Sequence, residues 1–270
     1  MFLVCSDILW FEEITDTLVG TVVDWRTTVT TKLISSAASK LAYANSSIEL
    51  SSYDRSQILK LDHQDWAEFA QEWRNSYKTF VMNFVPGKTE WRDIDTHHYL
   101  SLLELLEKRK LDNIYIKEEV KEISLVWHFL DPWKDSSEGI HQLSSMFITS
   151  TLSNGNPSLL DDLQKHGNLG FKKLQSSADF KAYKPHPDVY TGAAKAMGLH
   201  PGEVAMVAAH LVDLKAARGC GFQTIYVERK REEDWGHDEE DYQDARSWVD
   251  MWVTEDENGF MEVARRFGCE

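Results

Sequence analysis

Cysteine is scarce in this sequence. The three cysteines, Cys5, Cys220 and Cys269, show no C-x-x-C spacing. A structural zinc site or a disulfide framework needs several cysteines at short, regular spacings, so neither is expected. We predict three free thiols and a reducing compartment.

Basic residues are few as well. The chain has 29 lysines and arginines against 44 acids, a net charge of −15, and no long basic run. Nucleic acids and anionic membranes bind clustered Lys and Arg, so we expect neither class of partner. A small anionic substrate is the expected partner, and it would have to meet locally placed cations. A homodimer stays open.

Long apolar runs are missing too. No stretch reaches the ~18 apolar residues that a membrane span requires. The N-terminal run MFLVCSDILWF lacks a basic start, contains Asp7 and is followed by Glu12 and Glu13, unlike a secretory signal. A cytoplasmic protein is predicted.

The domain organisation follows from changes in hydrophobic period, because the chain has no repeat and no Pro/Gly-rich linker. Its 270 residues, 42% hydrophobic and 27% charged, suit a soluble globular chain with one main domain and a smaller insertion. Between about 27 and 114 the pattern is helical, and Thr96 is expected to cap a helix there. The first helix of this region carries Trp66, Phe69, Trp73, Tyr77 and Phe80 at three- and four-residue steps. We therefore predict an α/β core from residues 1–26 and 115–270 and a helical cap from residues 27–114.

From Met146 onward, strands and helices alternate. MFITSTL, VAMVAAH and FQTIYV each predict a buried strand, and helices are expected from Pro157, Pro187 and about Val212. This order predicts a doubly wound parallel sheet, in which ligands bind beyond the carboxyl ends of the strands.

Polar residues stand at those strand ends. Ser153, His210 and Asp213 follow predicted strands, and Lys184 lies in a loop that could face them. Taken singly, each has a plain alternative: Ser153 in a turn, Lys184 as a solvated loop residue, Asp213 at a helix N-terminus. Their joint order favours a site, although His210 is assigned no chemical role.

These segments carry a family resemblance. TLSNGN, YKPHPDVY and VAAHLVDLKAARGCGF, with GTVVDWR and WHFLDPWKDS before them, resemble the haloacid dehalogenase superfamily, and specifically its 2-haloacid dehalogenase (type II) branch. The resemblance implies a Rossmann-type core with a cap. It also implies hydrolysis of a short 2-halo acid, in which an aspartate displaces halide and forms an ester that water then cleaves.

The resemblance also implies roles for individual residues. Lys184 would keep the nucleophile ionised, because an ammonium favours a neighbouring carboxylate, and Asp213 would position Lys184 and the water. Arg74 resembles the residue on the halide side, although a solvated helix arginine is the plain alternative. The substrate-binding residues implied are Thr21, Arg74, Ser153 and Asn154.

Metal-dependent phosphatases of the superfamily are the alternative activity. They usually place an acid four residues before the aspartate that matches Asp213, since Mg²⁺ prefers several oxygen ligands, and here that position is Ala209. We therefore expect no cofactor and no metal.

The nucleophile motif departs from the family pattern. The aspartate should stand three residues before Gly20, where this chain has Thr17. Asp16 is the nearest acid and the predicted nucleophile, but a one-residue slip in a strand turns a side chain to the opposite face. A local bulge would restore its direction. Otherwise the chain would be an inert relative that binds a small acid or a protein.

Overall fold

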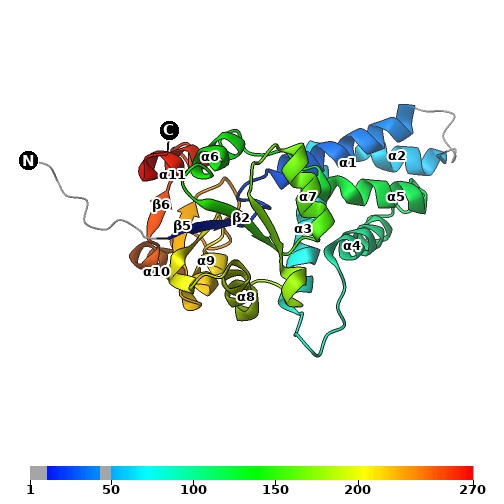
Figure 1. Ribbon diagram of the computed structural model, residues 1–270. Helices are drawn as coiled ribbons and strands as arrows, with labels where there is room; N and C mark the ends of the chain where they lie inside the picture. The colour runs from blue at the N-terminus through cyan, green and yellow to red at the C-terminus, as the bar shows by residue number, and fades with distance from the viewer. Residues whose placement is uncertain (1–10, 43–49, 270) are drawn as a thin grey trace, which may run out of the picture.

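The computed structural model describes residues 11–42 and 50–269. A parallel sheet in the strand order β3-β2-β1-β4-β5-β6 forms its centre (Figure 1). The strands are β1 (Glu13–Asp16), β2 (Ile148–Ser153), β3 (Lys173–Ser176), β4 (Val204–Ala208), β5 (Gln223–Val227) and β6 (Met251–Val253). This topology confirms the predicted doubly wound α/β fold.

Helices cover both faces of the sheet, as doubly wound sheets require. Leucines of α7 and Phe260 of α11 share one apolar cluster with Ile14 and Val207, whereas α8, α9 and α10 pack on the other face with Met206. The core helices are α6 (Ser136–Leu143), α7 (Pro157–His166), α8 (Pro187–Met197), α9 (Leu211–Gly219), α10 (Glu240–Trp248) and α11 (Gly259–Phe267).

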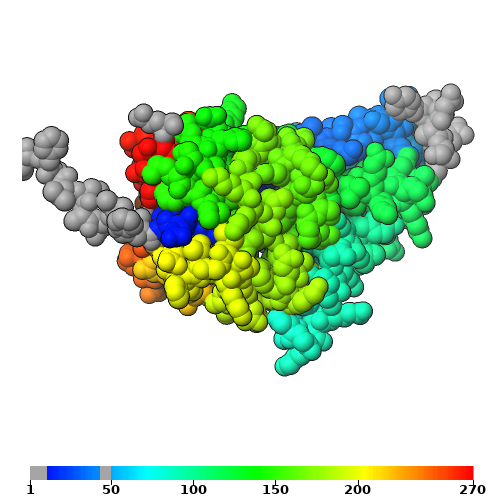
Figure 2. Space-filling model, in the orientation of Figure 1, coloured from blue at the N-terminus to red at the C-terminus, as the bar shows by residue number. Residues whose placement is uncertain are grey.

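A helical segment lies between β1 and β2 in the chain and beside the sheet in space (Figures 1 and 2). Its helices are α1 (Trp25–Ala42), α2 (Ser52–Lys60), α3 (His63–Met82), α4 (Ile94–Lys108) and α5 (Lys117–Ser124). No strand falls in the described residues between 27 and 115. The division into a core (1–26 and 115–270) and a cap (27–114) stays a prediction, and the last of these helices, α5, falls outside the predicted cap bounds.

Short 3-10 helices complete the chain at Leu125–His128, Ser177–Phe180 and Pro201–Glu203. The first of them contains His128, whose Nδ1 lies 2.8 Å from Asp162 of α7 and whose Nε2 lies 3.1 Å from Asp95 of α4. This histidine therefore links the helical segment to the core.

Two details differ from the sequence-based expectations. Thr96 does not cap α4: the cap is Asp93, whose carboxylate accepts the Thr96 N–H over 2.7 Å, so the helix begins earlier than predicted. Strand β3 was not predicted, because its residues KLQS are mostly polar and it lies at an edge of the sheet.

Other predictions can be compared with the structure in part. Cys220 and Cys269 are free thiols, and Cys5 lies outside the described residues. Within residues 11–42 and 50–269, no helix is both long and apolar enough to cross a bilayer.

Candidate active site

Lys184 and Asp213 meet where the parallel strands end. Lys184 lies in the loop before α8, and Asp213 lies in the first turn of α9. Lys184 Nζ donates to Asp213 Oδ2 over 2.8 Å, and the two side chains are only 7% and 12% exposed. The predicted charge pair is therefore confirmed, while its catalytic role stays a prediction.

The Asp213 carboxylate is held in its ionised form. Burial alone would raise the pKa of this carboxyl, but the Lys184 ammonium and the hydroxyls of Thr17 and Tyr190 together bring its pKa below the usual value. Tyr190 donates to Oδ1 and Thr17 to Oδ2. Tyr190 was missed in the sequence, although it closes the YKPHPDVY segment on which Lys184 was recognised.

Thr17, not Asp16, stands beside this pair. Lys184 Nζ donates to Thr17 Oγ1 over 2.8 Å. Side chains alternate along a strand, so Asp16 points to the face of the sheet opposite Thr17. On that face Ile14 of β1 belongs to the same apolar cluster as Val207, the residue that pairs with Asp16. The expectation that the Asp16 carboxylate reaches Lys184 is thus wrong for this structure, because no bulge turns it toward the site.

In this position the carboxyl group of Asp16 is buried and isolated. The side chain is fully buried, and among the described residues neither carboxyl oxygen finds a hydrogen-bond partner. Burial raises the pKa of Asp16 well above its ordinary value, and the more distant Lys184 offsets only part of this rise. Burial thus shifts Asp16 toward its neutral, protonated form.

Ser153 and Asn154 follow β2, as predicted, and form one wall of the site. Asn154 Oδ1 accepts the Lys184 N–H over 2.8 Å, and Asn154 Nδ2 donates to the Tyr77 hydroxyl over 3.1 Å. Ser153 Oγ accepts the Gly155 N–H over 3.2 Å and keeps its own proton to donate. Asn154 thus joins the lysine loop to α3, while the Ser153 hydroxyl donates to no other residue in the described part of the chain.

Arg74 and Thr21 occupy different places. Arg74 lies on α3 with 7% exposure, and its guanidinium carbon is 4.6 Å from the centre of the Tyr77 ring. Thr21 Oγ1 accepts the Ala209 N–H over 2.9 Å, so this hydroxyl ties the glycine turn to the end of β4. Arg74 borders the cavities described next; Thr21 supports the backbone that surrounds them.

Two cavities share Thr17, Arg74 and Lys184 among their lining residues. An inner cavity of about 50 Å³ reaches Ser153 and Asn154, and a wider one of about 270 Å³ opens past Asp213. The structure thus brings Lys184, Asp213, Arg74, Ser153 and Asn154 to two cavities with shared walls, and Asp16 lines neither of them.

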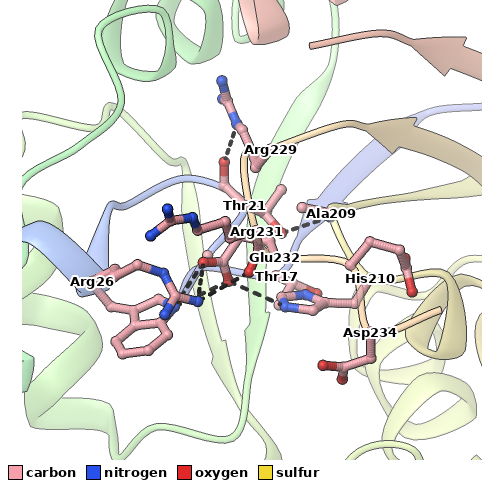
Figure 3. A network of polar contacts seen from close by, with 12 residues as sticks. Thr17, Thr21, Arg26, Ala209, His210, Arg229, Arg231, Glu232 and Asp234 are labelled. Atoms are coloured by element: carbon pink, nitrogen blue, oxygen red, sulfur yellow. Dashed lines mark hydrogen bonds and ion pairs between the residues drawn. The ribbon is translucent and has the colours of Figure 1, made fainter. Parts of the chain in front are cut away.

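A buried carboxylate, Glu232, lies beside His210, which lines the wider cavity, in a network of polar contacts (Figure 3). Trp25 Nε1 donates to it over 2.9 Å, and His210 Nε2 lies 3.4 Å from its Oε2. Burial would raise the pKa of Glu232, but His210, Arg74 and Trp25 bring it below the ordinary value. Glu232 is therefore ionised and holds His210 at the cavity; no sequence motif had marked it.

Gly20 lies against this pair. Its φ is +93°, and a Cβ there would stand 2.2 Å from Glu232 Oε2 and 2.9 Å from His210 Cε1. Only glycine fits this turn, both for its backbone conformation and for the space available.

Comparison with known proteins gives a consistent family signal. Residues 14–221 match the family model of the haloacid dehalogenase-like hydrolases. The chain is 34% identical over 104 residues to (S)-2-haloacid dehalogenase 4A of Burkholderia cepacia, and this match covers 37% of the chain and 45% of that protein. It is 32% identical over 106 residues to (S)-2-haloacid dehalogenase 1 of Pseudomonas sp. (strain CBS-3), covering 38% and 47%. The matched part is thus less than half of each of these relatives.

Solved structures extend the similarity along the chain. A defluorinating L-2-haloacid dehalogenase superposes with a TM-score of 0.76 at 29% identity, over 95% of this chain and 94% of that one. Another L-2-haloacid dehalogenase gives 0.73 at 27% identity, over 95% and 99%.

Proposed function

We propose, since the chain belongs to the haloacid dehalogenase-like hydrolase family, that it is a hydrolase of the 2-haloacid dehalogenase type, which releases halide from a short 2-halo carboxylic acid. One observation carries this proposal. Lys184, Asp213, Ser153, Asn154 and Arg74 come from distant parts of the sequence and line two cavities that share Lys184, Asn154 and Arg74, at the carboxyl ends of the strands.

Substrate binding follows from the donors around this cavity. A carboxylate entering a partly dry site needs hydrogen-bond donors, which the Ser153 hydroxyl and the N–H groups of the adjoining turn can supply. The halogen on C2 would then point toward Arg74, whose positive charge stabilises the leaving halide. Both ends of the substrate would thus meet a donor or a cation. Such local groups are needed because the chain as a whole is strongly negative and would repel an anionic substrate.

The reaction would proceed in two displacements. A carboxylate oxygen of the protein attacks C2, the carbon–halogen bond breaks, and the halide leaves with the bonding electrons. Water then attacks the carbonyl carbon of the resulting ester, which releases the 2-hydroxy acid and regenerates the carboxylate. Lys184 would hold the nucleophile ionised, and Asp213 would fix Lys184.

The nucleophile is the incomplete part of this site. In the structure the place beside Lys184 holds the Thr17 hydroxyl, and Asp16 would reach it only if β1 moved along its neighbours by one residue. This observation favours a second candidate function, a relative that binds short 2-halo acids without turning them over. The two candidates differ in turnover and agree in binding.

Replacing Thr17→Asp tests the proposal directly. We expect this variant to release halide from 2-chloropropionate at least about 10²-fold faster than the parent, because it restores a carboxylate beside the lysine. Halide release and the mass of the trapped ester on residue 17 are the measurements. Activity that survives EDTA is expected, whereas EDTA-sensitive release of phosphate from phosphoesters would favour the phosphatase alternative.

Two control variants assign the nucleophile. If Asp16→Asn removes a turnover that the parent shows, Asp16 reaches the site in solution. Lys184→Ala, introduced into the Thr17→Asp variant, should abolish turnover while the far-UV circular dichroism spectrum is retained. An inactive Thr17→Asp variant that also fails to bind 2-chloropropionate would overturn the proposed function.

The composition extends the proposal to the setting of the protein. The negative net charge and the absence of a basic run support a small-molecule partner in place of a nucleic acid or a membrane. A cytoplasmic location and a possible homodimer belong to the same proposal.

A further inference from the structure

The inner cavity has one wall that the proposed mechanism does not use. His98 of α4 and Trp127, in the 3-10 helix before the core, line this cavity together with Arg74. The rings of His98 and Trp127 are stacked, with their centres 4.6 Å apart. His98 is 4% exposed and Trp127 is 1% exposed, so this wall is closed to bulk water.

Both side chains bury polar atoms without a partner. Neither ring nitrogen of His98 nor Nε1 of Trp127 makes a hydrogen bond to any described residue. Buried polar groups are nearly always hydrogen-bonded, and an unpaired one in a native structure indicates an absent water, ion or ligand. Two such groups side by side, on a cavity next to a guanidinium, indicate a ligand that accepts hydrogen bonds.

The charge around the cavity narrows the kind of ligand. Among the described residues that line the cavity there is no aspartate or glutamate, but there are two cations, Arg74 and Lys184. Burial, with the nearby charges of His97 and Arg74, lowers the pKa of His98 far below its ordinary value, so this ring is neutral and carries one N–H. The wall therefore presents two neutral N–H donors beside a cation, which suits a small anion.

We propose that the N–H groups of His98 and Trp127 bind the leaving halide together with Arg74, and that they select for fluorinated 2-halo acids. This inference rests on the proposed function. A cavity of about 50 Å³ has room for a halide ion beside these donors. Fluoride is the smallest halide ion, so its charge comes nearest to the donor hydrogens and gains most from them.

The donors act as the carbon–halogen bond breaks. The electron pair of that bond goes to the halogen, and the negative charge that grows on it is met by N–H groups already in place. Fluoride is the poorest leaving group of the halogens, so the C–F bond depends more on this stabilisation than the C–Cl bond does. His98 and Trp127 would therefore determine which halogen leaves.

The kinetic test compares two substrates and a set of variants, made in the Thr17→Asp background if the parent is inactive. His98→Leu and Trp127→Phe remove one donor each, and His98→Gln retains one. His97→Leu is the matched control, because His97 is a buried neighbour that stacks on Phe80 and does not line the cavity.

We expect kcat/KM for 2-fluoropropionate to fall about tenfold to hundredfold in His98→Leu and in Trp127→Phe, as for loss of a hydrogen bond to an ion. For 2-chloropropionate the fall should be about threefold or less, so the ratio of the two substrates changes. His98→Gln should restore part of the ratio, and His97→Leu should leave it unchanged. An equal fall for both substrates, or an unchanged ratio in His98→Leu, overturns the inference.

A crystallographic test is independent of turnover. Crystals soaked in bromide should show anomalous scattering in the inner cavity, within hydrogen-bond distance of His98 and Trp127, and the signal should vanish in His98→Leu but not in His97→Leu. Ordered water in that place, or bromide only elsewhere on the protein, counts against the site. If bromide binds as expected and no variant turns over a halo acid, the proposed function fails and the anion site stands. If turnover is found and the ratio of the two substrates is the same in all variants, the proposed function stands and the role of His98 and Trp127 in halogen selection fails.

Discussion

β1 and β4 lie side by side at the centre of the sheet, yet they are built from opposite kinds of residue. Every residue of β4, VAMVA, is apolar and buried. β1, EITD, is buried to the same degree but carries Glu13, Thr15 and Asp16. The two strands pair in register, with Asp16 opposite Val207.

The difference shows that β4 forms through its own apolar sequence and that β1 forms through its neighbours. β4 forms a buried strand on its own pattern, whereas β1 takes its place because the strands on both sides provide a full set of backbone partners. The cost falls on the side chains: Glu13 Oε2, Thr15 Oγ1 and both carboxyl oxygens of Asp16 find no partner in the described part of the chain. β1 is thus stabilised by its neighbours and destabilised by its own polar groups.

The largest expected effect is to make β4 resemble β1. Val207→Asp would place a second carboxyl group opposite Asp16 in the apolar cluster. We expect a loss of about 4 kcal/mol or more in the free energy of unfolding, since both a buried side chain and a buried unpaired polar group are involved. Urea denaturation measures it, with Val207→Ala as the control for lost volume. A cost no greater than that of Val207→Ala would show that this face of the sheet tolerates carboxyl groups.

The reverse change should make β1 resemble β4. Asp16→Val removes an unpaired buried carboxyl, and we expect the free energy of unfolding to rise by about 1–3 kcal/mol. Because burial shifts Asp16 toward its neutral form, Asp16→Asn should change stability much less. A destabilised Asp16→Val variant would mean that the carboxyl has a partner in solution, for example at Lys184 after a shift of β1.

Glu13 gives the comparison a pH dependence. Burial raises the pKa of Glu13 from 4.5 to about 7, although a hydrogen bond from Ser150 and the charge of Lys173 oppose the rise. The folded state therefore holds this proton more tightly than the unfolded state, and stability is lost as the pH rises from about 4.5 to about 7. Glu13→Gln should remove about 1–3 kcal/mol of that loss. Thermal unfolding of both proteins at pH 4.5, 6 and 7.5 would measure it, and parallel pH profiles would contradict the assignment.

The strands that follow Met146 were largely predictable because their apolar runs and turn residues agree with the fold. β2, β4 and β5 appear close to the predicted segments, and α7 and α8 begin at Pro157 and Pro187 as expected. The edge strand β3 lacked such a run, and the cap of α4 was misplaced because Thr96 and Asp93 are both good capping residues.

The site was predictable in its motifs and not in its supporting residues. Lys184 and Asp213 lie within recognisable segments of the sequence, and their side chains do form an ion pair. His98 and Glu232 come from segments that resemble an ordinary amphipathic helix and a solvated loop, whereas Trp127 begins the recognised WHFLDPWKDS segment without a role of its own. Only folding brings His98 and Trp127 to the inner cavity. The register of β1 decides whether residue 16 or 17 faces Lys184, and a strand with two acids in four residues does not reveal it.

The central position of β1 also has a consequence for how the chain is made. β1 leaves the ribosome first, but its partners β2 and β4 begin only at Ile148 and Val204. Until both have been synthesised, this strand has no permanent neighbour, and unpaired apolar strands in nascent chains tend to aggregate. Glu13 and Asp16, exposed and ionised at that stage, keep the waiting strand soluble. The same two acids that weaken the finished sheet thus protect the unfinished one.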